Sequence, residues 1–274
     1  NIFFGLSILL LVGCASESME FTTAKTALRS EKDFVRAEEW LKKALKADTT
    51  DAMVAYVYAT EILKPQKRYK KMASMLDLAV KRNSNQKLET PFMWEDKPVL
   101  TINDGVQAYK EQEWTIIYNS GIDFYQNNEL DRAIDLLETA LLFLPNDGST
   151  YSTLGALYIE NNDLDKAGEI LKKGLSFDSN NSSLLEISAT YFIKLNDLVN
   201  AENILIKALN LSKNPGNILR QLVFVQIDLE KYESAIEYSL QALRDFPNDP
   251  DIYYNVAVLY QKMGINKFDS AREK

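Results

Sequence analysis

Residues 148–181 read GSTYSTLGALYIENNDLDKAGEILKKGLSFDSNN, and the hydrophobic skeleton of this stretch recurs along much of the chain. An alanine stands at positions 133, 167, 201 and 235, each 34 residues after the one before it. A fixed period of this length is typical of a helical repeat array, because one repeat cannot bury its apolar face alone and must stack on its neighbours. The sequence therefore predicts an all-α solenoid.

Four blocks keep this register without a gap, and we take them as four regular repeats over residues 114–249. Small residues recur in them where two helix backbones must approach closely, with larger side chains filling the space around them. These small residues are Gly121, Gly155 and Ala189, then the alanine series, then Ala140, Gly174, Ala208 and Ala242. Asn127-Asn128, Asn161-Asn162-Asp163 and Asn196-Asp197 are turn residues at the point where each repeat must reverse direction.

These positions resemble the tetratricopeptide repeat (TPR), which has two helices per repeat. Pro145 and Pro247 stand at the helix-ending proline position of that family, and Ser179 and Lys213 depart from it. The resemblance implies a right-handed TPR superhelix, an α-solenoid. We expect substitution of a large side chain at a small position, such as Ala167→Trp, to destabilise the fold by overpacking.

The same skeleton continues outward with less fidelity. Residues 18–86 fit two divergent TPR-like repeats, the second with one extra residue near Pro65. Residues 250–274 begin a further repeat, but the stretch from Gly264 to Asp269 departs from the spacing, and we expect the repeat to be truncated. A missing start is also expected, because no basic segment precedes the apolar residues at the N-terminus.

Residues 87–113 break the period. Pro91, Phe92, Trp94 and Pro98 indicate an irregular aromatic insertion, after which the helix of the next block starts about two turns before Trp114. Two interpretations remain open at this point. Phe92 and Trp94 either dock on neighbouring helices as part of a linker, or belong to a loop that folds over the groove and contributes to ligand binding.

Residues 1–13 contain an apolar run, Ile2 to Val12, of the length of a signal-peptide core and too short to span a bilayer. The run ends in Leu11-Val12-Gly13-Cys14, which resembles the lipobox of bacterial lipoproteins. That resemblance implies cleavage before Cys14 and covalent lipid on its thiol and amine. Residues 14–17 then form a short tether. Ala15 follows the cysteine in place of Asp, which by the sorting rule of such lipoproteins predicts the outer membrane of a bacterial cell envelope.

The charge of the chain argues against several classes of function. The net charge is −8, so the electrostatic footprint of nucleic-acid binding is missing. The sequence contains no histidine, which removes most metal-site and triad chemistry. We find no phosphate-binding glycine loop and no poised carboxylate pair. The sequence therefore predicts no catalytic residue, no metal site and no cofactor other than the lipid on Cys14, and we expect a protein that is not an enzyme.

TPR ligands commonly lie in the concave groove lined by the first helices, so the resemblance implies which side chains face a partner. The candidates are Tyr118, Asn119, Ile122, Tyr125, Ser152, Thr153, Glu186, Ile187, Thr190, Ile193, Arg220, Gln221, Phe224, Ile227, Tyr254 and Asn255. Exposed aromatic side chains among polar groups suit peptide recognition, although the same residues could pack each helix on its neighbour.

Two functions follow from these expectations. The first is a membrane-anchored scaffold or adaptor for other envelope proteins or peptides, in a role of the envelope- or outer-membrane-assembly type. The second is a lipid-anchored capture protein for a small ligand or glycan, with Trp94 and the tyrosines of the groove as a stacking platform. An open groove would favour the first function, and a closed pocket the second.

Overall fold

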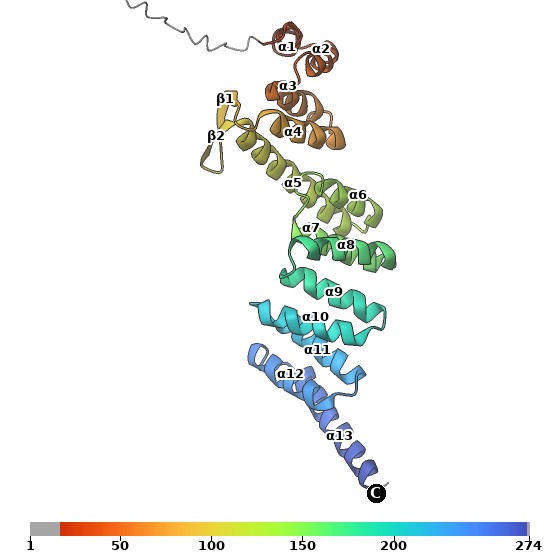
Figure 1. The fold of residues 1–274 in the computed structure, drawn as a ribbon. Helices are drawn as coiled ribbons and strands as arrows, with labels where there is room; N and C mark the ends of the chain where they lie inside the picture. The colour runs from red at the N-terminus through yellow and green to blue at the C-terminus, as the bar shows by residue number, and fades with distance from the viewer. Residues whose placement is uncertain (1–16, 273–274) are drawn as a thin grey trace, which may run out of the picture. The chain divides into compact units, whose positions relative to one another are not determined.

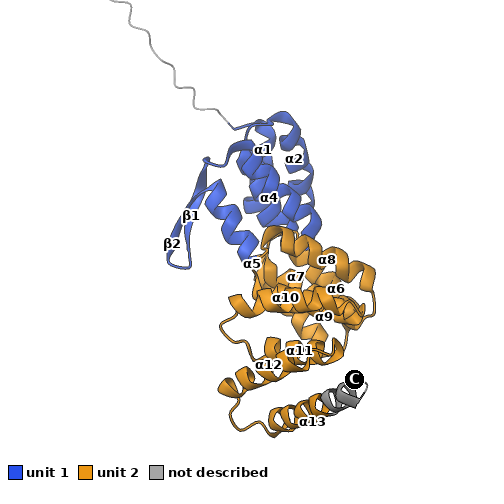
Figure 2. Cartoon of the chain, turned by 60° about the horizontal axis from the view of Figure 1, so that its bottom comes forward, with its two compact units in different colours: residues 1–112 blue, residues 113–274 orange. Residues whose placement is uncertain are grey.

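The structure of the protein, a computed structural model, describes residues 17–272. Helices make up most of these residues, and the strands form one hairpin (Figure 1). The chain divides into two compact units, the first ending at Gln112 and the second beginning at Glu113 (Figure 2). The predicted all-α solenoid is confirmed, and each unit is described here by itself.

Unit 1 contains two helical pairs. The first pair is α1 (Met19–Thr26), extended by the π-helical segment η1 (Ala27–Glu31), and α2 (Phe34–Ala47); the second is α3 (Ala52–Val57), extended by η2 (Tyr58–Leu63), and α4 (Tyr69–Asn83). The side chains of Ser18, Asp33 and Asp51 cap α1, α2 and α3 by accepting hydrogen bonds from backbone amides of the first turn. Phe21, Leu41, Tyr58 and Leu76 are fully buried in the core of this unit.

The insertion is a β-hairpin, which differs from the irregular segment that the sequence predicts. Strand β1 (Lys87–Trp94) pairs antiparallel with β2 (Lys97–Thr101), and Phe92 lies opposite Val99. Glu95 and Asp96 join the strands with φ values of 46° and 62°. Positive φ at both central residues is the geometry of a two-residue hairpin turn.

Helix α5 (Ile102–Gln126) follows the hairpin directly, and the boundary between the two units falls within it. It starts earlier than the two turns before Trp114 that the helical pattern predicts. Unit 2 contains the second half of α5 and eight further helices, which make four successive pairs, starting with α5, and one last helix. They are α6 (Leu130–Ala140), α7 (Gly148–Glu160), α8 (Leu164–Phe177), α9 (Ser182–Lys194), α10 (Leu198–Leu211), α11 (Gly216–Asp228), α12 (Tyr232–Asp245) and α13 (Pro250–Arg272).

The alanine series forms the centre of unit 2. Ala133, Ala167, Ala201 and Ala235 are all fully buried, each on the second helix of its pair. The small residues on the first helices also pack closely: a Cβ added to Gly155 in α7 would lie 2.4 Å from Cδ2 of Leu171 in α8. Close approach of the two helices therefore needs these small side chains.

The turn inside each repeat uses one left-handed residue. Asn128, Asn162, Asn196 and Glu230 have φ values between 57° and 62° and stand 34 residues apart. Lys32 and Lys67 hold the same conformation in unit 1, 35 residues apart, which accounts for the extra residue near Pro65. Asparagine tolerates this conformation better than other residues with a Cβ, so the asparagines found in the sequence mark the turn of three repeats.

The C-terminal segment differs from its prediction. Where the sequence spacing predicts a break between Gly264 and Asp269, helix α13 continues through these residues to Arg272. Gly264 lowers helix propensity, but one glycine inside a long helix costs only about 1 kcal/mol relative to alanine. A glycine in a helical pattern therefore does not mark a helix end by itself.

Candidate functional site

The candidate partner-binding surface lies on the first helices of the repeats in unit 2. We call it the first-helix face, defined by the predicted residues on the second half of α5 and on α7, α9, α11 and α13. Six of these residues are exposed: Asn119, Tyr125, Arg220, Phe224, Tyr254 and Asn255. Nine are half-buried: Tyr118, Ile122, Thr153, Glu186, Ile187, Thr190, Ile193, Gln221 and Ile227.

Several side chains on this face form hydrogen bonds from one repeat to the next. The hydroxyls of Tyr118 and Thr153 are 3.1 Å apart, and the Tyr125 hydroxyl donates to Glu160 at 2.8 Å. Gln221 Nε2 donates to Glu186 Oε1 over 3.4 Å. Each bond joins a residue to the one 35 positions further along the chain. These side chains therefore help to hold successive first helices together, which is one of the two roles that the sequence left open.

Ser152 does not fit the prediction that it faces a partner. It is 8% exposed, and its hydroxyl donates to the backbone oxygen of Ser149 at 2.9 Å. Its neighbour Thr153 is half-buried and carries the bond to Tyr118 instead. Leu154 and Gly155, on the same turn of α7, are also buried. Ser152 therefore lies on the side of α7 that faces the core.

Trp114 belongs to this face, although the sequence analysis assigned it only to the helical pattern. Its ring stacks on Tyr118 with centroids 5.1 Å apart and an interplanar angle of 24°. Its Nε1 donates to the buried Thr150 hydroxyl at 2.9 Å. Two aromatic residues four positions apart lie on the same side of a helix, and this spacing could have identified the pair.

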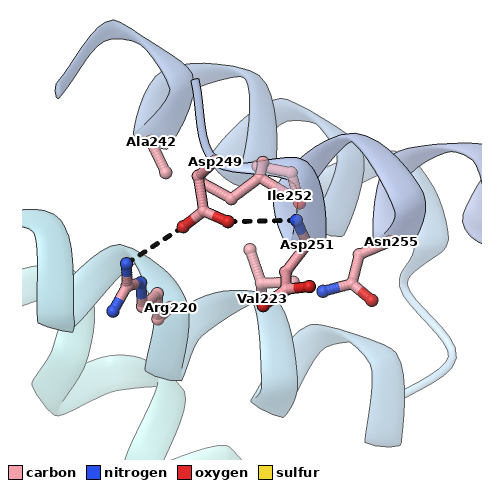
Figure 3. Close-up of a pocket in the computed structure, with 8 residues that line it drawn as sticks. Arg220, Val223, Ala242, Asp249, Asp251, Ile252 and Asn255 are labelled. Carbon is pink, nitrogen blue, oxygen red and sulfur yellow. Dashed lines mark hydrogen bonds and ion pairs between the residues drawn. The ribbon is translucent and has the colours of Figure 1, made fainter. Parts of the chain in front are cut away.

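A pocket of about 340 Å³ lies between α11, α12 and α13, beside Arg220 and Asn255 (Figure 3). Arg220 Nη2 lies 3.1 Å from Asp249 Oδ2, and the other oxygen of Asp249 accepts a hydrogen bond from the backbone amide of Asp251 at 3.0 Å. The guanidinium of Arg220 also lies 4.8 Å from the centroid of the Phe246 ring. Arg220 is therefore held in place at the pocket by Asp249 and Phe246, and the other charged side chain that lines the pocket is that of Asp251.

A second pocket, also of about 340 Å³, lies between α7 and α9. Its apolar lining comes from Ala156, Ile159 and Ile187, and its polar lining from Glu160, Asn162, Thr190 and Lys194. Ile187 and Thr190 are two of the predicted residues of the first-helix face. This pocket can take a short aliphatic side chain next to hydrogen-bonding groups.

Two half-buried glutamates of unit 2, Glu186 on the first-helix face and Glu202 on the second helix α10, differ in their electrostatics. Burial raises the pKa of Glu186, and its hydrogen bond from Gln221 is long. Burial acts in the same direction on Glu202, but hydrogen bonds from Lys231 and Gln226 outweigh it and lower its pKa. Glu186 therefore lacks the cationic partner that offsets burial at Glu202.

The insertion residues lie in unit 1, where both aromatic side chains contact α5. The rings of Phe92 and Tyr109 have centroids 6.1 Å apart, and Trp94 Nε1 donates to Glu111 Oε2 at 3.4 Å. Lys25 and Arg29 each form an ion pair with Glu89, at 2.8 and 3.0 Å, which fixes β1 on the first helical pair. These contacts favour the interpretation of Phe92 and Trp94 as residues that dock the insertion on its neighbours.

Other predicted features concern anchoring and metal binding. Cys14, with the predicted signal segment and most of the tether, lies outside the described residues. Between residues 17 and 272, no helix combines the length and the apolar character needed to cross a bilayer. In the same part of the chain, no three or more His, Cys, Asp or Glu side chains are grouped so that they could hold a metal ion.

Comparisons with known proteins agree with this fold. A family model described as tetratricopeptide repeat matches residues 124–188. A comparison with curated proteins finds no match.

Among solved structures, a crystal structure of MamA is 21% identical with a TM-score of 0.50, and the match covers 60% of this chain and 92% of MamA. A second MamA structure is also 21% identical, with a TM-score of 0.49 over 54% of this chain and 86% of MamA. A structure of PilF from Pseudomonas aeruginosa is 16% identical with a TM-score of 0.43, and the match covers 90% of this chain and 96% of PilF. Residues 124–188 therefore match the tetratricopeptide repeat, and the helical pairs have the fold of a TPR solenoid.

Proposed function

We propose that this TPR protein is a scaffold or adaptor that binds peptide segments of other proteins on its first-helix face. The observation that carries the proposal is the exposure of Phe224 and Tyr254, which are 50% and 70% exposed on the first helices α11 and α13. Large aromatic side chains that stay exposed among polar groups are enriched at protein interfaces. Asn119, Arg220 and Asn255 supply exposed hydrogen-bonding groups on the same face.

The proposal includes a lipid anchor on Cys14 at a membrane of the bacterial cell envelope, with the outer membrane as the expected site. The lipobox-like Leu11-Val12-Gly13-Cys14 supports the anchor. Each buried methylene of an acyl chain contributes about 0.8 kcal/mol, so several chains give a durable attachment. Glu17, three residues after Cys14, binds Lys25 of α1 at 2.5 Å. A tether of three residues reaches about 10 Å, which would hold unit 1 near the bilayer.

Site-specific photocrosslinking tests the binding face. A benzoylphenylalanine residue placed at Phe224 or Tyr254 of the full chain, expressed in its host, should form adducts with a distinct protein. Leu240, which is 48% exposed on the second helix α12, is the matched control position. Adducts of equal amount from position 240, or the absence of adducts from both 224 and 254, would contradict the proposal.

The second candidate is capture of a small polar ligand, and the pocket beside Arg220 favours it. A ligand in this pocket would contact the Arg220–Asp249 ion pair and Asn255 without a protein partner. The same experiment separates the two candidates. A small ligand would be favoured by two results together. Position 254 would give no protein adducts, and a low-molecular-weight fraction of the host would raise the melting temperature of the chain.

A further inference from the structure

Glu186 differs from three other glutamates of the chain, Glu38, Glu89 and Glu202. Glu38, Glu89 and Glu202 each form an ion pair with a lysine or arginine, at distances between 2.6 and 3.0 Å. For Glu186, the described residues supply no ion pair, and the side-chain hydrogen bond that it receives comes from Gln221 at 3.4 Å. A half-buried carboxylate without a cation loses hydration that the protein does not replace.

Gln221 adds a second unsatisfied acceptor at the same place. Its Nε2 donates to Glu186, while its Oε1 is buried and has no hydrogen-bond partner among the described residues. A carboxylate can accept about four hydrogen bonds, and an amide oxygen about two. The site therefore offers several acceptors and lacks donors. Lysine and arginine, whose side chains carry a positive charge and several donors but no acceptor, match this chemistry.

The surroundings of Glu186 suit the rest of such a side chain. Ile187 and Thr190, on the same turn and the next turn of α9, are half-buried and leave part of their apolar surface exposed. Lysine and arginine carry apolar stems that pack on surfaces of this kind while the charged group reaches an acceptor. The net charge of −8 adds a long-range attraction for basic segments.

We propose that Glu186 and Gln221 form a binding site for a lysine or arginine side chain of a peptide partner. This inference rests on the proposed peptide-binding function and names the partner's chemistry. The ammonium or guanidinium group donates to the Glu186 carboxylate, which Gln221 holds through its Nε2, and its stem lies over Ile187. The ion pair would supply the cation that this carboxylate lacks within the chain.

Peptide display on the full chain tests the proposal. A library of random dodecapeptides is selected against the wild-type protein and against Glu186→Gln, which has nearly the same shape and no charge. Glu169→Gln on the second helix α8 is the control, because Glu169 is exposed and its substitution changes the net charge equally. The wild type and the Glu169→Gln control should both enrich peptides with a lysine or arginine at one fixed position, and Glu186→Gln should lose this preference.

A double-mutant cycle then measures the contact. The best peptide is compared with a version in which norleucine replaces the basic residue, using fluorescence anisotropy. Norleucine in the peptide should weaken binding to the wild-type protein about tenfold, which corresponds to about 1.4 kcal/mol, and should have little effect with Glu186→Gln. Equal weakening for both proteins would overturn the assignment of Glu186.

The outcomes separate this inference from the proposed function. Selection of no peptide by the wild type would contradict peptide binding itself and the site with it. Selection of peptides without a basic preference, or with one that persists in Glu186→Gln, would leave peptide binding intact and overturn the basic-residue site.

Discussion

The Cβ of Tyr151 in α7 lies so close to the backbone of Gly174 in α8 that a Cβ added to the glycine would stand 2.7 Å from it. The corresponding positions in the other three regular repeats hold Ala140, Ala208 and Ala242. Replacement of Gly174 by the alanine of the other repeats therefore brings its Cβ against the Cβ of Tyr151, an atom whose position is fixed by the backbone of α7 and which cannot rotate away.

We expect Gly174→Ala to lower the free energy of unfolding by about 1 kcal/mol, because overpacking of about 2 kcal/mol outweighs the gain in helix propensity of about 1 kcal/mol. Chemical denaturation of the variant measures this change. Gly264→Ala is the matched control, since no atom lies within 4 Å of the added Cβ in α13. The control should be neutral or stabilising, and a stabilising Gly174→Ala would show that the helices can separate at little cost.

The turn of the fourth regular repeat gives a stabilising prediction. Glu230 holds a φ of 58° where the three preceding repeats hold asparagine. Glu230→Asn should raise the free energy of unfolding by about 0.5–1 kcal/mol, because asparagine adopts the left-handed conformation with less strain. Thermal unfolding measures the change, and the reverse substitution Asn196→Glu should destabilise by a similar amount. A Glu230→Asn variant with a lower melting temperature would contradict the assignment of strain to this turn.

The raised pKa of Glu186 predicts how stability depends on pH. Burial raises its pKa in the folded state, so the folded protein binds more protons than the unfolded chain just above the ordinary glutamate pKa. Stability is therefore lost as the pH rises through the folded pKa of Glu186. We expect Glu186→Gln to melt at a higher temperature than the wild type at pH 7. The difference should vanish below the unfolded pKa of about 4.3.

Glu38 should behave in the opposite way. Burial would raise its pKa, but hydrogen bonds from Lys42, Tyr58 and Arg68 outweigh it and lower the pKa to about 2. Its contribution to stability is present above the unfolded pKa and is lost as the pH falls towards the folded value. Glu38→Gln should therefore melt below the wild type at pH 7, with a difference that shrinks between about pH 4.3 and pH 2. Melting curves of the two glutamine variants over this range test both signs together.

The hairpin should contribute to the stability of unit 1 through its aromatic side chains. Phe92→Ala removes the contact with Tyr109 and should cost about 1–2 kcal/mol, less than a fully buried phenylalanine, because Phe92 is half-buried. Met93 is 64% exposed, so Met93→Ala is the control and should be within about 0.5 kcal/mol of the wild type. Equal stability of the two variants would mean that the hairpin does not dock through Phe92.

The lipid anchor is tested at Cys14. Metabolic labelling with an alkyne-bearing fatty acid should mark the wild-type chain and fail to mark Cys14→Ser. The variant should move from the membrane fraction to the soluble fraction, since the acyl chains supply the attachment. Incorporation of label into Cys14→Ser would contradict lipidation at this residue.

Much of the fold could be predicted from the sequence because the repeat supplies several independent signals. Ala167 and its counterparts mark the close contact between helices, and Asn162 and Asn196 mark the turns. The hairpin could not be predicted in this way. Pro91 and Pro98 weaken a strand signal, and Glu95-Asp96 is not a typical sequence for a two-residue turn.

The candidate site could be predicted only in part. The family resemblance identifies which positions lie on the first helices, but it does not say which side chains bond to the next repeat. Tyr118 and Thr153 are occupied in this way, whereas Phe224 and Tyr254 remain exposed. Whether a side chain is bonded or exposed depends on the residue that it meets in the neighbouring repeat. The position of a residue within its own repeat does not identify that partner.

The left-handed residue of each turn has a consequence for how such a chain can change during evolution. Asn128, Asn162 and Asn196 repeat with the same period as the buried alanines, so duplication or loss of a whole 34-residue segment keeps turn and core in phase. A single residue can be gained or lost only where this change disturbs neither the buried alanine nor the left-handed residue of the turn. The 35-residue spacing from Lys32 to Lys67 is such a case, with the added residue near Pro65. The number of repeats can therefore change during evolution by one whole repeat at a time, while the contact between neighbouring repeats keeps its geometry.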